Sequence, residues 1–247
     1  MRMNSLTLAG IAAVAGLAAA NSTLAVVVYD YGGIGPGLAF NAPRPTTNAD
    51  IGTLATLPSG QQWQIDSITV ARVHGGIAGG VDIGFFLWST VNTTAPAGTS
   101  IFSNLLNATI FSRTVAAGST SVLTTNITFA PGSLLLNGGS TFGYQMEYAA
   151  PGSINATTAA YTPNTIGVGA FFEDQGASLA GSSADGFWAN SSADGKVQAA
   201  DGPITFAAPN VAKSNVFLII NATAVPAPAS AALLGLGGLV AARRRRN

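Results

Sequence analysis

The residues that could do chemistry in this chain of 247 residues are few. His74 is the only histidine and cysteine is absent, which excludes thiol catalysis, disulfides and thiolate metal sites. His74 precedes Gly75-Gly76, as in the oxyanion loop of esterases, but no Gly-x-Ser-x-Gly elbow occurs. A lone histidine would have to act as general base unaided. We therefore interpret His74 as a polar residue at a strand end.

The carboxylates do not form an obvious catalytic pair either. Glu173 and Asp174 are adjacent, so in a strand they face opposite sides and cannot flank one glycosidic bond. A pair of Glu147 with one of these two carboxylates is the remaining arrangement, in which a glycan-cleaving enzyme would use Glu147 or Glu173. Ten carboxylates in one chain make a chance pairing easy. We predict that the protein is not an enzyme and that it has no catalytic residues.

A small repeat supplies the only candidate metal ligands. Ser182–Gly186 has the sequence Ser-Ser-Ala-Asp-Gly, which recurs at Ser191–Gly195, and an Ala-Asp-Gly echo follows at residues 200–202. Asp-Gly is first a turn signal, because Asp bonds its own backbone and Gly adopts positive φ. The alternative is a Ca²⁺ site of oxygen ligands. It would use Asp185, Asp194 and Asp201. The spacing fits neither an EF-hand nor the calcium nonapeptide repeat, so we predict turns and no required cofactor.

Trp188 and Asn190 lie within the same region and are the candidate ligand-binding residues. Exposed aromatic rings beside polar side chains grip sugars by stacking and hydrogen bonding. The alternative is that the tryptophans belong to the core, which we favour clearly for Trp63 and Trp88. For Trp188 both interpretations stay open.

The distribution of charge excludes one class of partner. Charged residues are only 8% of the chain, against roughly 25% in a typical soluble domain. Residues 26–225 contain five basic and ten acidic residues, a net charge of −5. Nucleic-acid binding needs clustered Lys and Arg to neutralise phosphates, so we exclude it. Cations and neutral glycans remain compatible.

The elements that must position these residues are predicted to be strands. Phe142, Tyr144, Met146 and Tyr148 alternate with small or polar residues, and a bulge is expected near Asp66-Ser67. Turn signals separate the segments, and no long amphipathic helix occurs between them. We predict an all-β domain, a single antiparallel β-sandwich that is jelly-roll-like, over residues 26–222. The segments expected to be strands are 26–31, 63–73, 81–88, 120–129, 141–148 and 216–220.

The N-terminal segment Met1–Ala25 is predicted to be a secretory signal peptide, the first of two flanking helices. Arg2 gives a positive start, and Leu6–Ala20 is apolar apart from one threonine. Small residues allow cleavage before Asn21 or before Val26.

The C-terminal tail, residues 223–247, has three parts in order. A Val-Pro-Ala-Pro motif at Val225–Pro228 precedes an apolar stretch, Ala229–Ala242, and an arginine cluster. The apolar stretch has 14 residues, which span about 21 Å as a helix, short of the ~30 Å hydrocarbon core. The arginines form a cytoplasmic stop under the positive-inside rule. The residues of the predicted signal are Val225, Pro226, Pro228, Arg243, Arg244, Arg245 and Arg246.

This tail resembles the PEP-CTERM sorting signal of Gram-negative bacteria, with Ala227 where the family has Glu. The resemblance covers about 23 residues. It implies a membrane-embedded, exosortase-like processing enzyme as partner, transient contact with the inner membrane, and delivery to the cell surface or the exopolysaccharide matrix. A plain C-terminal membrane anchor is the alternative.

Together these features predict an exported, non-enzymatic protein of the cell surface or exopolysaccharide matrix with a structural or adhesive role. A carbohydrate-binding module that uses Trp188 is the second hypothesis. A glycan-cleaving enzyme is the third.

Overall fold

The protein is described here by a computed structural model. It describes residues 24–31, 47–53, 60–117, 120–170, 172–174, 180–183, 186–190, 194–204 and 214–225. These residues form fourteen strands and one 3₁₀ turn, η1 (Ala199–Asp201), with no α-helix among them. No helix within these ranges is long and apolar enough to cross a membrane. The predicted signal and tail helices lie outside the described residues.

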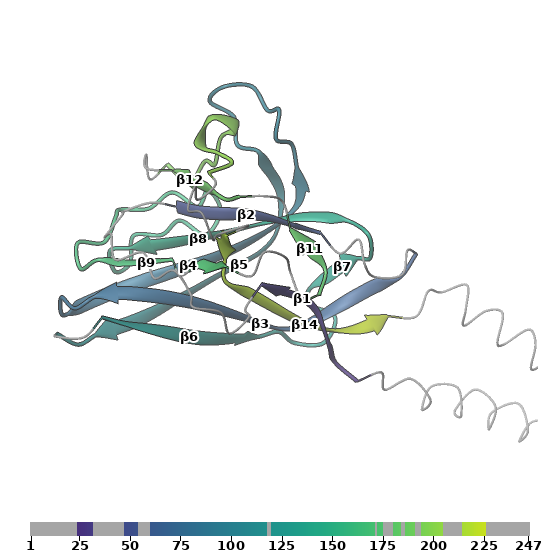
Figure 1. Ribbon diagram of the computed structural model, residues 1–247, viewed down its shortest axis with the longest axis horizontal. Helices are drawn as coiled ribbons and strands as arrows, with labels where there is room; N and C mark the ends of the chain where they lie inside the picture. The colour runs from purple at the N-terminus through teal and green to yellow at the C-terminus, as the bar shows by residue number, and fades with distance from the viewer. Residues whose placement is uncertain are drawn as a thin grey trace, which may run out of the picture.

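Two antiparallel sheets make up most of the fold (Figure 1). The first, here the β3 sheet, has the order β1-β14-β3-β6, with β7 and β9 also on β3. Its strands are β1 (Val26–Tyr31), β3 (Gln62–Gly75), β6 (Thr120–Thr128), β7 (Leu135–Asn137), β9 (Val168–Ala170) and β14 (Leu218–Val225).

The second, the β8 sheet, has the order β11-β2-β8-β4-β5, with β12 also on β2. Its strands are β2 (Thr47–Thr53), β4 (Gly79–Val91), β5 (Phe102–Val115), β8 (Thr141–Ala149), β11 (Ser182–Ser183) and β12 (Trp188–Asn190). A separate two-stranded sheet pairs β10 (Phe172–Asp174) with β13 (Ser214–Val216). The predicted all-β class with antiparallel pairing is confirmed, and the two facing sheets are consistent with a β-sandwich.

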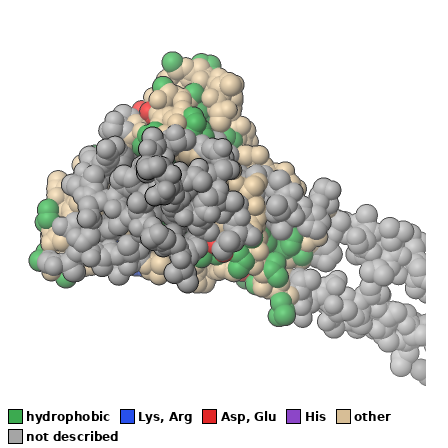
Figure 2. All heavy atoms as spheres, viewed as in Figure 1, with side chains coloured by type: hydrophobic (Ala, Val, Ile, Leu, Met, Phe, Trp, Pro, Cys, Tyr) green, Lys and Arg blue, Asp and Glu red, His purple; other side chains and the backbone are tan. Residues whose placement is uncertain are grey.

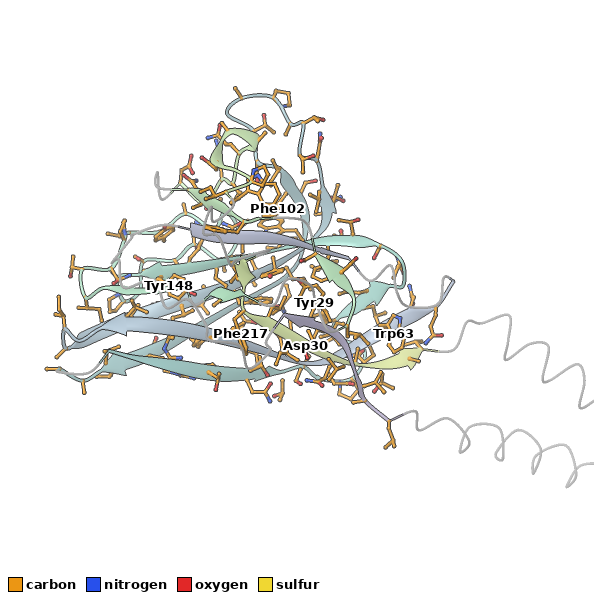
Figure 3. The ribbon with its side chains drawn as sticks, in the orientation of Figure 1. Tyr29, Asp30, Trp63, Phe102, Tyr148 and Phe217 are labelled. Carbon is orange, nitrogen blue, oxygen red and sulfur yellow. The ribbon has the colours of Figure 1, made fainter. Side chains whose placement is uncertain are left out.

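The main core lies between the two sheets. The predicted alternation on β8 is confirmed, because Phe142, Tyr144, Met146 and Tyr148 all belong to the core that β1, β3 and β14 also line. Tyr29 of β1 contacts the rings of Phe142 and Tyr144 edge-on, at centroid distances of 5.4 and 6.2 Å. Figure 3 shows Tyr29 and Tyr148 between the layers. Trp63 is buried in this core as predicted.

The predicted bulge in β3 is confirmed at Asp66. Consecutive residues Asn221 and Ala222 of β14 pair with Ser67 and Ile65, so Asp66 is the extra residue on β3. The hydroxyl of Thr223 donates to Asp66 Oδ2 at 2.7 Å. The bulge reverses the parity of β3, which is why both Ile65 and Ile68 are buried in the same core.

The other face of the β8 sheet is covered as well, which the alternation alone did not predict. Every residue from Phe142 to Ala149 is buried. Segment 92–101 and the described part of segment 186–204 (residues 186–190 and 194–204) form, with Phe102 of β5, a second apolar cluster of Ala95, Ile101, Phe102, Trp188 and Val197. Loop 150–166 covers β4, where Ile154 and Pro151 lie close to Gly84 and Gly80. A Cβ atom on Gly143 would lie 2.3 Å from the Phe102 ring, so this position requires glycine. Figure 3 shows Phe102 above the β8 layer. A polar face on β8 is therefore enclosed.

The strand β14 ends three residues later than the predicted domain boundary at 222. Thr223, Ala224 and Val225 continue the ladder with β3, and Val225 pairs with Gln62. At the other end of the chain, Val26 pairs with Ala222. The described chain therefore enters β1 and leaves β14 at the same end of the sheet (Figure 1).

Candidate functional site

The strongest cluster of buried polar groups lies on the outer face of β8. Gln145 and Glu147 are two residues apart, so both point away from the main core, and both are fully buried. Gln145 donates through Nε2 to Glu147 Oε1 at 2.8 Å and to the carbonyl of Gly195 at 3.0 Å. The pair therefore ties the central strand of the sheet to the covering segment 186–204.

Strand register places the two candidate ligand residues on the same face as this pair. Trp188 pairs with Ala49 of β2, and Ala49 pairs in turn with Gln145 of β8. Asn190 is two residues after Trp188 and pairs with Thr47, so its side chain is on the same face. Opposite Glu147 on the other side stands Gly84 of β4, which has no side chain to compete for the space. The sequence separation of Gln145 and Trp188 gave no sign that they share a face.

Burial changes the acidity of Glu147. Removal from water raises the pKa of its carboxyl to about 8, and the hydrogen bond from Gln145 opposes this only in part. Glu147 is therefore mostly protonated at pH 7. Its Oε2 and the Oε1 of Gln145 have no hydrogen-bond partner among the described residues. A neutral acid with an unused oxygen is suited to donating a proton, but the described residues enclose this side chain completely.

The covering segment is held by Asn190 and by Asp194 of the predicted repeat. Asn190 Nδ2 donates to Asp194 Oδ1 at 2.9 Å and also to the carbonyl of Lys196. The same Asp194 oxygen accepts the backbone N–H of Lys196 at 2.9 Å. Gly195 has φ +76°, and a Cβ there would lie 2.3 Å from the carbonyl oxygen of Thr158. Asp194-Gly195 thus forms a tight turn pressed against a second covering loop.

Of the predicted calcium ligands, two are seen and both serve turns. Asp201 accepts the backbone N–H of Gln198 at 2.7 Å at the start of η1. Asp185 lies outside the described residues. Within the described ranges no group of three His, Asp or Glu side chains could hold a metal ion.

For Trp188, the structure favours the core over an exposed sugar platform. Its side chain is 3% exposed and packs in the second apolar cluster. Trp88 of β4 is half-buried beside it, stacked between Phe86 and Phe102 at centroid distances of 6.5 Å each. Asn190 is equally buried and bonded within the turn. Neither candidate ligand residue offers a free surface in this conformation.

The remaining candidates are distributed over separate elements. His74 is near the end of β3, as predicted, and pairs with Ser121 and Val168. Glu173 is in β10, opposite Asn215, whereas Glu147 belongs to the β8 sheet. Of the predicted sorting signal, Val225 is in β14. Pro226, Pro228 and Arg243–Arg246 lie outside the described residues.

Comparisons with known proteins add no relative. No protein-family model, no curated protein and no solved structure matches the chain.

Proposed function

We propose that this chain is an exported, non-enzymatic protein of the cell surface or exopolysaccharide matrix, with a structural or adhesive role. One observation carries the proposal. The carboxyl group with a raised pKa, Glu147, is fully buried beside Gln145, which is hydrogen-bonded to Gly195 of the covering segment, so the described residues leave a polymeric substrate no path to it. Catalysis on a glycan needs an acid within hydrogen-bond reach of the glycosidic oxygen.

The exposure of the aromatic side chains supports a structural role rather than sugar binding by aromatic stacking. Every aromatic side chain whose burial is described is buried or half-buried. Sugar platforms need an exposed ring face. On the face shown in Figure 2, the described atoms are mainly neutral polar and apolar, with few charged side chains. A carbohydrate-binding function at Trp188 and Asn190 therefore has no support in this conformation.

The proposal includes a finer fold and a route of export. The finer fold is a single jelly-roll-like sandwich. The route comprises cleavage of the leader before Asn21 or Val26, followed by recognition of the tail by an exosortase-like enzyme at the inner membrane. The pairing of Val26 with Ala222 supports this route, because both processed ends would then leave one end of the domain toward the membrane.

The test combines localisation with mass spectrometry and an activity assay. In a bacterium that secretes an exopolysaccharide and sorts such tails, we expect the protein in the surface or matrix fraction, with its leader removed. Purified protein incubated with a panel of polysaccharides should release no reducing sugar. Sugar release that Glu147→Gln abolishes would overturn the non-enzymatic assignment, and an intact Met1 on surface protein would overturn the export route.

A further inference from the structure

Exposed apolar side chains gather at the end of the β3 sheet where β1 begins and β14 ends. Four of the eight large hydrophobic side chains that are exposed among the described residues belong to this end, namely Leu24, Val26, Val27 and Leu135, which are 39 to 85% exposed. The register brings them to one end, since Val26 pairs with Ala222 of β14 and Leu135 pairs with Gln64 of β3. Figure 2 shows hydrophobic side chains at this end, at the lower right of the described atoms.

Val27 and Leu135 lie on the outer face of the β3 sheet, away from the main core. Val27 pairs with Asn221, which alternates with core residues of β14. Leu136, next to Leu135 in β7, is buried in the main core, so Leu135 points the other way. The strands follow in the order β1, β14, β3 and β7, and neighbouring strands are about 4.8 Å apart. The two side chains are therefore roughly 14 Å apart across the sheet.

The loop 129–134 lies over the outer face between β3 and β7. Gln64 Oε1 accepts the backbone N–H of Gly132 at 2.5 Å, and Gln64 Nε2 donates to the carbonyl of Ala130 at 3.4 Å. These bonds hold the loop in place, with Ala130 and Pro131 exposed. We call the surface made by these residues the apolar end. Its members are Leu24, Val26, Val27, Ala130, Pro131 and Leu135.

The segments that form the apolar end contain no charged residue. Residues 24–29, 60–65, 129–141 and 218–225 include no Asp, Glu, Lys or Arg. The chain from 26 to 225 has ten acidic and five basic residues, a net charge of −5. A membrane surface that contains anionic lipid repels acidic groups. The apolar end is therefore the part of this acidic domain that can approach lipid at the lowest electrostatic cost.

The chain that follows β14 is too short to let this end move far from a bilayer that holds the tail. Only three residues separate Val225, the last residue of β14, from Ala229, the first of the apolar stretch. An extended chain covers at most about 3.6 Å per residue, so these two positions are no more than roughly 15 Å apart. The headgroup region takes up about 5–8 Å of that distance. Insertion of the apolar stretch therefore keeps the end of β14 close to the headgroups.

We propose that the apolar end rests on the lipid surface of the membrane that holds the tail. The partner is the boundary between headgroups and acyl chains, which takes up apolar side chains of proteins that lie on a membrane. Cleavage of the leader before Val26 removes Leu24, whereas Val26 and Val27 remain after either predicted cut. This inference rests on the proposed function, because the tail brings the domain to the membrane, and it adds the surface that the domain turns toward the lipid.

The test compares fluorescent labels at the two ends of β3. The chain has no cysteine, so Leu135→Cys and Ile77→Cys each create a single labelling position. Ile77 is 55% exposed and follows the far end of β3. The 14 residues of β3 separate the two ends by about 40 Å. Both labels therefore replace exposed apolar side chains, and only one of them is at the apolar end.

The protein is secreted by a bacterium without an exosortase-like enzyme, so that the leader is removed and the tail is kept. It is reconstituted in vesicles of phosphatidylethanolamine and phosphatidylglycerol in equal amounts, with some nitroxide-labelled lipid. Flotation with the vesicles in a density gradient measures insertion of the tail separately. We expect the label at position 135 to be quenched several-fold more strongly than the label at position 77, with its emission shifted to the blue.

Val27→Asp should lower the quenching at position 135, because a carboxylate is costly to remove from water and is repelled by phosphatidylglycerol. The matched control is Ile77→Asp, which makes the same change on an exposed side chain at the far end and should leave the quenching unchanged. Equal quenching in the two variants would overturn the inference. If Val27→Asp has a lower melting temperature than the wild type, Pro131→Asp in the exposed loop replaces it.

The other outcomes separate this contact from its alternatives. A chain that floats with the vesicles but is quenched equally at positions 135 and 77 would overturn the inference and leave the proposed function standing. A blue shift at position 135 without quenching would mean that a second copy of the chain covers the apolar end, which would also overturn it. A chain that does not float would overturn both this contact and the membrane step of the proposed function.

Discussion

Glu147 is a buried acid whose position on β8 could be predicted from its neighbours in sequence, whereas its burial could not. The alternation of Phe142, Tyr144, Met146 and Tyr148 placed Glu147 on the opposite side of β8, which the structure confirms. That side was expected to be merely polar. Gln145, on the same side, is hydrogen-bonded to Gly195, fifty residues away, and no local pattern encodes such a contact.

Glu147→Gln should stabilise the protein increasingly as pH rises. The pKa is about 8 in the folded state against 4.5 for the free group, so the folded state keeps a proton that the unfolded state releases between these values. Stability of the wild type therefore falls as pH rises from 4.5 to 8. Thermal melts of both proteins at pH 4, 6 and 8.5 check this. A difference in melting temperature that does not change with pH would contradict the raised pKa.

Asp194→Ala should destabilise the protein by about 1–2 kcal/mol, because Asp194 accepts two hydrogen bonds within the turn. The loss should be the same in chelator and in about 5 mM calcium, above the millimolar dissociation constants typical of weak extracellular sites. Calcium-dependent stabilisation of the wild type that Asp194→Ala abolishes would establish a metal site instead.

At the scale of elements, the strands predicted from sequence were those with a continuous apolar row. β1, β3, β4, β8 and β14 have such rows because they line the main core, whereas the described side chains of β6 add only the partly buried Ile127. β5 was missed, since it is an edge strand whose Asn, Ser and Thr side chains are largely exposed. β2 was also missed, because its sequence Thr-Asn-Ala-Asp-Ile-Gly-Thr has no apolar alternation. Pairing with β8, not side-chain pattern, makes it a strand.

In the covering segment 186–204, position 195 requires glycine for two separate reasons, a close contact and a left-handed backbone. Gly195→Ala would place a Cβ 2.3 Å from the Thr158 carbonyl oxygen and would also force alanine to φ +76°. We expect a loss of stability well above the ~1 kcal/mol that left-handed backbone alone costs.

Gly98→Ala is the matched control for this prediction. Gly98 has φ +80°, and a Cβ there meets nothing within 4 Å. Denaturant unfolding of the two variants separates backbone strain from the steric clash. Equal destabilisation would mean that the close approach of the two covering loops does not limit stability.

At the scale of the whole molecule, the prediction that the protein is exported and retained at the cell surface rests on the two ends of the chain. Replacing Arg243–Arg246 with glutamine should disturb retention and processing, because the apolar stretch of 14 residues is short and the arginines supply the stop. Fractionation of cells and medium, with mass spectrometry of both ends, measures this. Wild-type localisation and processing of the variant would refute the sorting signal.

The adjacency of β1 and β14 also has a mechanical consequence. A tether attached after Val225 would pull the domain along β14. β14 lies between β1 and β3 and pairs with them along five and eight positions. A load along β14 would act parallel to the strand, so the ladder bonds on both sides would share it and break together rather than one at a time. A domain tethered through this strand would therefore resist mechanical unfolding under flow, although it has few charged residues that could form ion pairs.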